Sequence, residues 1–293
     1  MLKTLSRSFR PAAWLGWQVE SNWTDPLMFF AFQVLRPVAS VLILVFMFRV
    51  VAGTSAGASG ASSSGAASSI YAYIYLGNAF YIYVGAVMAG ASYSILDDRE
   101  RYRTLKYLYI APINIPVYLF GRAVARFVTG TIAVVITILA GVLFFKVPLS
   151  LGATHWPMFF GALMLGVFCL SFMGIIIGTW TLTIRNEPWF VGDAAAAALY
   201  LFSGAIFPIT ILPAFLQPIG FLLPMTYWLE LIRRALLGAG AAAFPTLAAF
   251  SNAQLFGILA AQTLAFGLIA VFAFRYFDRV AREKGLIDAQ SNF

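Results

Sequence analysis

The stretch that decides the fold runs from Asp97 to Pro112 and reads DDRERYRTLKYLYIAP. It carries seven of the chain's 19 basic and 11 acidic residues, and long apolar runs flank it on both sides. At helical spacing its apolar side chains fall on one face and its basic side chains on the other. The apolar face consists of Tyr102, Leu105, Leu108 and Tyr109, and the basic face of Arg99, Arg103 and Lys106. We therefore predict one amphipathic helix over residues 97–110 that lies flat on a membrane surface.

The composition is typical of an integral membrane protein rather than a soluble domain. The chain is 61% hydrophobic and 16% aromatic, with a mean hydropathy of +0.87. Its net charge of +8 is spread over short loops between apolar runs, which argues against nucleic-acid binding. A single cysteine, Cys169, and a single histidine, His155, leave no internal disulfide and no multi-cysteine or multi-histidine metal site. We expect neither a metal nor a cofactor in this chain.

The amino-terminal residues 1–26 are predicted to form an interfacial helix on the cytoplasmic side. Trp14 and Trp17 belong to its apolar flank, basic residues precede that flank, and Pro11 suits a first helical position. A disordered basic leader stays open as the alternative. The segment lacks the uninterrupted apolar core of a signal peptide, so we expect it to be retained.

Six apolar runs are long enough, or nearly long enough, to cross a bilayer. The predicted spans are about 29–51, 70–95, 117–145, 157–184, 191–207 and 255–277. Together they form an all-α transmembrane domain over residues 27–277, followed by a polar cytoplasmic tail at 278–293. Residues 52–69 contain only Ala, Gly, Ser and one Thr, which predicts a flexible loop without chemistry. The Gly174–Gly178 spacing in the fourth span predicts close helix packing.

Residues 208–238 are apolar but are interrupted by prolines, so one straight span is excluded. The prolines are Pro208, Pro213, Pro218 and Pro224. Two short helices that enter the outer leaflet and return fit this pattern better, and we predict an outer re-entrant hairpin. Glu230 lies three and four residues before Arg233 and Arg234, so it can pair with them along the second helix.

The second span is rich in tyrosine. Its first tyrosines suit an aromatic belt at the outer interface, whereas Tyr81 and Tyr83 lie deeper, near Asn78. These three residues are candidates for a substrate-facing wall, with ordinary core packing as the alternative. Asp193 lies within a turn of the interface at the start of the fifth span, and we expect it to cap that helix.

The distribution of Lys and Arg predicts the orientation. With the termini and the 97–110 segment on the same side, that side holds 15 of the 19 basic residues and the other side holds four. Basic residues favour the cytoplasmic side of a membrane protein. Both termini are therefore predicted to lie in the cytoplasm.

This layout resembles the type-2 permeases of ATP-binding cassette (ABC) exporters, of the drug and small-lipid kind. The segment DRERYRTL at Asp98–Leu105, followed by Ala111–Pro112, is similar to the family's R-E-R-G-T-L…P segment. The segment FSGAIFP at Phe202–Pro208 is similar to an S-G-x-x-F-P run that precedes outer re-entrant helices in the family. Arg103 stands where many members have glycine, which is a departure from the pattern.

The resemblance implies that residues 97–110 are a coupling helix seated in a groove of a separate ATPase subunit. The chain has no G-x-x-x-x-G-K-[ST] loop, so ATP and Mg belong to that partner. The implied particle has two ATPases and two permease chains in the membrane lipid, either a homodimer or a pair with a paralogue. The residues expected to contact the ATPase are Asp98, Arg99, Glu100, Arg101, Arg103, Thr104 and Lys106.

The resemblance also implies that spans one, two and five line the transport path. The candidate path residues are Asn78, Tyr81, Tyr83 and Phe202. The candidate residues of the outer hairpin are Pro208, Pro213, Pro224, Glu230 and Arg233. We expect export of an amphipathic or hydrophobic substrate, such as a drug-like molecule, lipid or glycolipid, across the inner membrane of a prokaryote.

Three other functions stay open. The first is export of a glycan-lipid, although no carbohydrate-binding cluster is evident. The second is ion-driven secondary transport, which typically uses repeated halves that this sequence lacks. The third is a membrane-embedded enzyme, for which the required cluster of His, Asp and Glu at one depth is missing.

Overall fold

The structure is a computed structural model in which almost every regular element is a helix. It describes residues 2–21, 35, 39, 41–43, 45–47, 64–111, 113–149, 152, 154–184, 187–238 and 246–286. No strand occurs within these ranges. Four helical segments are long and apolar enough to cross a membrane, namely Ser69–Arg101, Ile115–Leu143, Trp156–Thr181 and Asn252–Glu283. The all-α class predicted from the sequence is confirmed.

The predicted second span is one continuous rod built from four consecutive helical pieces. It consists of α3 (Ser64–Tyr83), η1 (Val84–Ala89), α4 (Gly90–Leu96) and η2 (Asp97–Arg101). Both η1 and η2 are π-helical, and short π-helical segments within α-helices are often found at functional sites. The rod therefore extends beyond the predicted end of the span and includes the start of the charged stretch.

The third, fourth and sixth predicted spans are the long helices α6 (Ile115–Leu143), α7 (Trp156–Thr181) and α11 (Asn252–Glu283). The side chain of Asn114 accepts a hydrogen bond from the backbone amide of Val117 (3.3 Å), which caps α6. Ser251 and Gln254 form a capping box that starts α11. The N-termini of these two helices are thus fixed by local side-chain contacts.

The predicted first and fifth spans have different outcomes. The fifth is the shorter helix α8 (Trp189–Phe202), which has 14 residues and is apolar. The first span and most of the 52–69 loop lie outside the described residues, although Val41 and Val45 are buried in a cluster with Tyr75. Residues 64–69 already belong to α3, so the prediction of a flexible loop was wrong for them. The six-span layout therefore stays a prediction.

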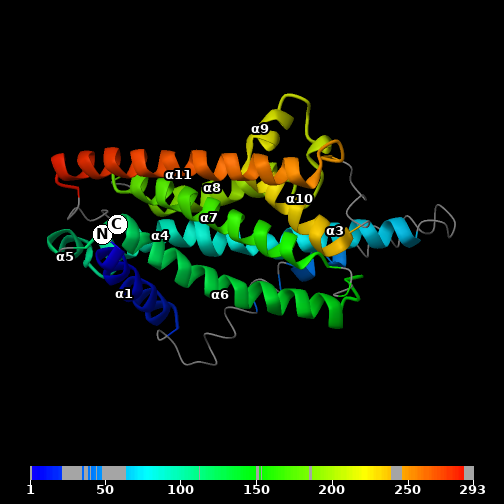
Figure 1. The fold of residues 1–293 in the computed structure, drawn as a ribbon, viewed down its shortest axis with the longest axis horizontal. Coiled ribbons are helices and arrows are strands. Elements are labelled where there is room, and N and C mark those ends of the chain that lie inside the picture. The colour runs from blue at the N-terminus through cyan, green and yellow to red at the C-terminus, as the bar shows by residue number, and fades with distance from the viewer. Residues whose placement is uncertain are drawn as a thin grey trace.

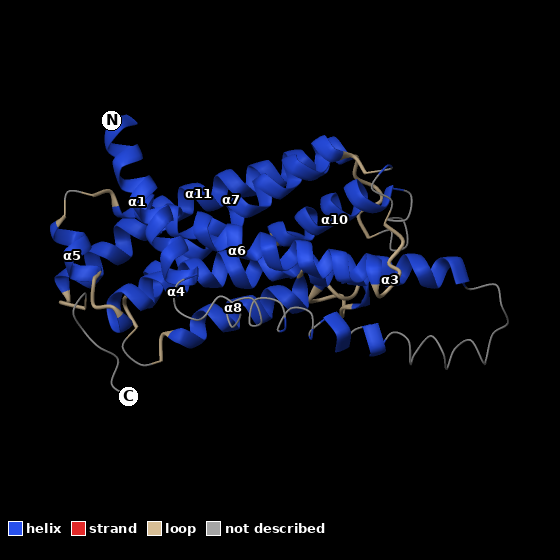
Figure 2. Ribbon diagram, turned by 90° about the horizontal axis from the view of Figure 1, so that it is seen from below, coloured by secondary structure: helices blue, strands red, loops and turns tan. Residues whose placement is uncertain are grey.

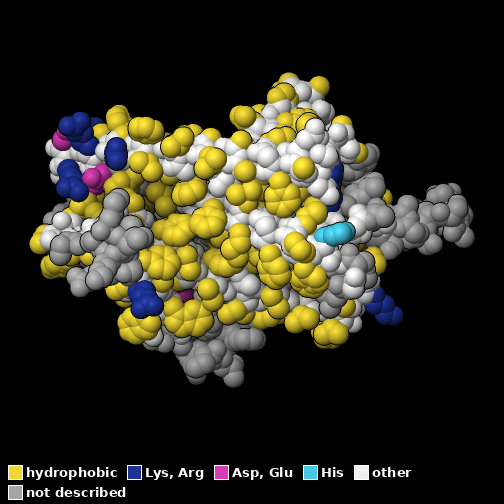
Figure 3. Space-filling view, in the orientation of Figure 1, with side chains coloured by type: hydrophobic (Ala, Val, Ile, Leu, Met, Phe, Trp, Pro, Cys, Tyr) yellow, Lys and Arg dark blue, Asp and Glu magenta, His cyan; other side chains and the backbone are white. Residues whose placement is uncertain are grey.

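The long helices run roughly along one direction and leave two distinct ends (Figures 1 and 2). One end, here called the α5 end, carries the short helix α5 (Leu105–Ile110) and the last turns of α11. The other, the α10 end, carries α9 (Gln217–Leu222) and α10 (Pro224–Leu237). On the face that Figure 3 shows, apolar side chains cover the middle, and most of the charged side chains lie toward the α5 end.

Helix α7 lies at the centre and packs against α4, η1, α10 and α11. Glycines allow these close approaches. A Cβ atom at Gly166 would lie 2.1 Å from Nε1 of the fully buried Trp228, and one at Gly174 would lie 2.5 Å from the carbonyl oxygen of Met88. One at Gly178 would lie 3.0 Å from Cα of Ser92. The close packing predicted from the Gly174–Gly178 spacing is therefore confirmed.

The amino-terminal helix α1 (Leu2–Ser21) packs along α6. It begins well before Pro11, which lies inside the helix, so the prediction of Pro11 at the first helical position was wrong. Trp14 is 64% exposed, as expected for a ring on the apolar flank of an interfacial helix. Contact between α1 and a membrane surface stays a prediction.

Two helices, α9 and α10, occupy the stretch predicted to form a hairpin, and a short η4 (Ile209–Ile211) precedes them. The prolines end or begin these pieces. Pro208 immediately precedes η4, Pro218 lies in the first turn of α9, and Pro224 is the first residue of α10. The break into short helices is thus as predicted, and its entry into a leaflet stays a prediction.

The fit of Trp228 against Gly166 can be tested by adding one methyl group. Gly166→Ala should lower the free energy of unfolding by about 1–3 kcal/mol, because the new Cβ collides with a buried ring that has no free space. The measurement is the thermal midpoint of the detergent-purified protein. Gly161→Ala on the same helix is the matched control, since its Cβ would meet Phe256 at an ordinary 3.5 Å. Equal midpoints for the two variants would contradict the packing.

Candidate functional site

The charged stretch forms a sharp turn rather than one amphipathic helix. Helix η2 ends at Arg101, a turn follows over residues 102–104, and α5 spans only Leu105–Ile110. Arg103 adopts a φ of 55°, in the left-handed region that ordinary residues rarely occupy. The prediction of a single helix over 97–110 was wrong, because the span continues through η2 and the chain then changes direction at Arg103.

This turn buries two residues that were expected on an exposed face. Asp98 is 2% exposed and Arg99 is 5% exposed. The reason is that η2 continues the rod of the second span, so its side chains face α6 and α7. The interpretation of these two residues as part of an open contact surface was therefore wrong for this structure. Glu100 is half-buried and pairs with Arg99 at 2.6 Å.

Asp98 joins the turn to α6. The Tyr118 hydroxyl donates a hydrogen bond to Asp98 Oδ2 at 2.8 Å, and the Arg122 guanidinium lies 3.9 Å from Oδ1. On the other side, the Thr104 amide donates to the Asp98 carbonyl oxygen at 2.8 Å. Arg122 is itself 2% exposed, so a buried ion pair holds the turn against this helix.

Arg99 joins the same turn to α7. Its guanidinium donates to the carbonyl oxygens of Leu182 at 3.1 Å and of Thr181 and Ile184 at 3.4 Å. The last carbonyls of a helix have no partner within the helix, and a basic side chain is a favourable donor to them. Arg99 therefore fixes the end of α7 to the end of the second span.

A further ion-pair network joins α1, α6 and η2. Arg126 on α6 lies 2.8 Å from Glu20 on α1 and 3.9 Å from Asp97 on η2. Burial raises the pKa of Glu20, while the positive charge of Arg126 acts in the opposite direction. Three elements thus meet at one basic side chain.

Helix α5 is tied to the last turns of α11. The Tyr109 hydroxyl donates to Asp278, and the Arg282 guanidinium lies 4.6 Å from the centre of the Tyr109 ring. Arg282 also pairs with Asp278 at 3.1 Å. Burial and the neighbouring carboxylate both raise the pKa of Tyr109, so it stays a neutral donor.

The exposed part of this segment is basic and partly apolar. Four of the predicted contact residues are exposed, namely Arg101, Arg103, Thr104 and Lys106. Tyr107 and Ile110 are 62% and 81% exposed and were not predicted. Sequence reasoning missed them because it assigned faces as if one helix continued through Arg103. We call residues 101–111 the α5 segment.

The predicted path residues are only partly brought together. Asn78 and Tyr81 face α8, where the Tyr200 hydroxyl donates to Asn78 Oδ1 at 2.9 Å. The rings of Tyr81 and Tyr200 lie 4.6 Å apart, and the Tyr81 hydroxyl donates to the carbonyl oxygen of Ala196. Phe202 is half-buried at the end of α8. Tyr200 was missed because its contact with Tyr81 joins residues distant in sequence, which helical spacing does not reveal.

Tyr83 does not belong to this face. It is 1% exposed, its ring stacks on Phe127 at 5.6 Å, and its hydroxyl donates to Thr131 at 3.0 Å. Two residues along a helix correspond to a rotation of about 200°, so Tyr81 and Tyr83 point to opposite sides. The assignment of Tyr83 to a substrate-facing wall is wrong for this structure, and the packing alternative holds.

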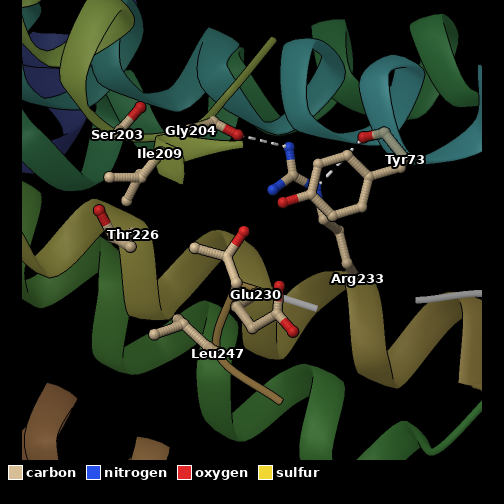
Figure 4. A pocket seen from close by; sticks show the side chains of 9 residues that line it. Tyr73, Ser203, Gly204, Ile209, Thr226, Glu230, Arg233 and Leu247 are labelled. Carbon is tan, nitrogen blue, oxygen red and sulfur yellow. Dashed lines mark hydrogen bonds between the residues drawn. The ribbon is translucent and has the colours of Figure 1, made fainter. Parts of the chain in front are cut away.

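At the α10 end, Arg233 is buried among backbone carbonyls (Figure 4). It donates to Ala205 at 2.8 Å, Gly204 at 3.0 Å and Tyr73 at 3.2 Å, and its guanidinium lies 3.6 Å from the centre of the Tyr73 ring. Glu230 instead pairs with Arg234 at 2.9 Å, so only one of the two predicted pairings along α10 is present as a salt bridge.

A small polar pocket lies beside Arg233. Its lining includes Glu230, Thr226 and the buried, unpaired hydroxyls of Ser203 and Thr246. It has room for about one water molecule, which is too little for a substrate. Within the described residues no group of three potential metal ligands occurs.

The chain matches the family model described as ABC-2 type transporter over residues 13–237. It belongs to this family. The match covers the α5 segment, the predicted path residues and all of α10, and it identifies the chain as a multi-pass membrane protein and a transport subunit. Membership also implies that this ABC-2 subunit works with an ABC ATPase. Comparison with curated proteins finds no significant match.

The buried Asp98–Arg122 pair can be tested with a double-mutant cycle. Asp98→Leu should destabilise the protein by about 3 kcal/mol or more, because it leaves the buried Arg122 without its nearest carboxylate. The double variant Asp98→Leu/Arg122→Leu should recover part of that loss, measured as the thermal midpoint. Tyr118→Phe, which removes one hydrogen bond, should cost about 1 kcal/mol. Strictly additive single and double effects would refute the coupling.

Proposed function

We propose that the chain is the permease subunit of an ABC exporter that moves an amphipathic or hydrophobic substrate, with ATP hydrolysed by a separate subunit. The observation that supports this most is the α5 segment. It exposes basic and apolar side chains, while the buried residues around it are tied to several long helices. A small exposed element with such connections is suited to receive force from a partner.

The connections give a physical route for that force. Displacement of the α5 segment by the ATPase would act on α6 through Asp98 and on α7 through Arg99. It would act on α11 through Tyr109. Packed helices and charge-assisted hydrogen bonds resist independent motion, so these helices would move together. The ATPase would bind ATP and Mg, and this chain would change shape.

We place the α5 end in the cytoplasm and the α10 end outside, with both termini inside the cell. The basis is the concentration of basic residues in the segments assigned to the inner side, 15 of 19 in the whole chain. The clustering of charged side chains at the α5 end agrees with this orientation (Figure 3). The membrane would be the inner membrane of a prokaryote.

The nature of the substrate is inferred from the face between α3 and α8. Its polar groups, on Asn78, Tyr81 and Tyr200, are largely paired with each other or with backbone. The remaining surface is aromatic and apolar, which favours a drug-like molecule, a lipid or a glycolipid over a highly polar solute. Two copies of the chain with two ATPases would enclose the path between them. The hairpin, anchored through Arg233, would close its outer end.

Charge reversal on the α5 segment tests the ATPase contact. Arg103→Glu should greatly reduce co-purification of the ATPase subunit, because it places a negative charge in an exposed basic surface. Membrane insertion and the thermal midpoint should change little, since Arg103 is exposed. The control is Arg279→Glu on α11, whose side chain is 81% exposed. Unchanged co-purification in Arg103→Glu would remove this surface from the contact.

The energy source is tested by reconstitution. Vesicles that contain both subunits should accumulate a fluorescent amphipathic substrate only with ATP and Mg, and vesicles with the permease alone should not. Uphill transport by the permease alone, or transport driven by a proton or sodium gradient without ATP, would overturn the proposal in favour of a secondary transporter.

A further inference from the structure

Asp193 is a carboxylate on the exposed face of an otherwise apolar helix. It is the only charged residue in α8, and its nearest exposed neighbours along the helix are Phe190, which is 64% exposed, and alanines. An acidic side chain at the centre of a membrane span costs about 3 kcal/mol, and less near the interface, and acids within spans generally have a partner or a function.

Capping of α8 does not account for Asp193, so that prediction was wrong. The first turn of α8 contains no acidic residue, and no side chain caps its amino terminus. Asp193 lies one full turn after Trp189, where the orphan backbone amides have already ended. Instead, Asp193 accepts a hydrogen bond from the hydroxyl of Tyr93 on α4.

The hydrogen bond occupies one carboxylate oxygen but brings no positive charge to the carboxylate. In the described ranges, the ion pairs join arginines to other acids, and none of them involves Asp193. The exposed carboxylate therefore has room and charge for a cation from outside this chain.

Two aromatic rings flank the carboxylate. Trp189 precedes Asp193 by four residues and so lies on the same face of α8. The Trp189 and Tyr93 rings are 5.9 Å apart and inclined by 37°. Gly192 makes room for this arrangement, because a Cβ atom there would lie 3.3 Å from the Tyr93 ring. The hydroxyl of Tyr93 and the glycine together hold the ring beside the acid.

A carboxylate beside aromatic rings favours an organic cation over a metal ion. Aromatic faces attract alkylated or delocalised cations, which carry little hydration to lose. Calcium takes six to eight oxygen ligands, typically from several side chains, whereas this site offers one carboxylate. The surrounding apolar surface can accommodate the hydrophobic part of such a cation.

We propose that Asp193, Tyr93 and Trp189 form a binding site for amphipathic organic cations at the α5-side end of the face between α4 and α8. The site is continuous with the predicted path, because Ala196, whose carbonyl accepts from Tyr81, lies three residues along the same helix. Its use in transport rests on the proposed function, and it narrows the substrate class to molecules that carry a positive charge.

The test measures binding by the full-length permease alone in lipid nanodiscs, without ATPase or ATP. The probe is radiolabelled tetraphenylphosphonium, and tetraphenylborate serves as an anion of the same shape. Asp193→Asn should weaken binding of the cation by about tenfold, which corresponds to about 1.4 kcal/mol, and should not weaken binding of the anion. Tyr93→Phe keeps the ring and should have a smaller effect. Glu283→Gln removes an exposed acid on α11 and should leave both affinities unchanged.

Equal affinity of Asp193→Asn and the parent chain for tetraphenylphosphonium overturns the proposal. So does a change in oligomeric state with cation binding unaltered, because Asp193 would then pair with a second copy. If Asp193→Asn does not fold, Asp193→Glu must retain binding and Trp189→Leu must weaken it. Since no ATP is present, failure of this site leaves ATPase co-purification intact. Conversely, loss of the ATPase contact leaves cation binding intact.

Discussion

The structure depends on one constraint, which is that a buried charge in a membrane protein must find its partners within the protein. Two buried arginines satisfy this constraint in the same way, because each donates hydrogen bonds to backbone carbonyls at the end of a helix. Arg99 donates to carbonyls at the end of α7, and Arg233 donates to Gly204 and Ala205 just beyond α8. Each arginine thereby satisfies acceptors that would otherwise be orphaned and joins two helices. In the described part of the chain, one of these arginines lies at each end of the bundle.

The helical architecture could largely be predicted from the sequence, because bilayer thickness sets the length of an apolar run. The helix boundaries around the turn at residues 102–104 could not be predicted in this way. Hydrophobic periodicity treats 97–110 as one helix, and nothing in a pattern of residue types reveals that Arg103 adopts a positive φ. One signal for the turn was available. The family segment that this stretch resembles has glycine where this chain has Arg103, and glycine adopts a positive φ without strain.

The candidate site was predicted in part for a related reason. Exposure of Arg101, Arg103 and Lys106 follows from charge, whereas Asp98 and Arg99 are buried because they pair with groups distant in sequence, on α6 and α7. Tyr81 and Tyr83 are a different case, because local composition grouped them although residues two apart on a helix point to opposite sides, so their separation was predictable from the spacing. Long-range pairing decides the burial of Asp98 and Arg99, and a single sequence does not encode it visibly.

Helix α11 has a consequence for how the molecule can deform. Its 32 residues span about 48 Å. Near one terminus the Asn252 side chain accepts from Arg234 of α10, and near the other Asp278 accepts from Tyr109 of α5. An α-helix hardly stretches, so α11 keeps α10 at one end of the bundle and α5 at the other end from moving further apart. Shape changes that preserve both attachments are therefore limited to tilting, bending or axial rotation of α11, and exclude lengthening of the bundle.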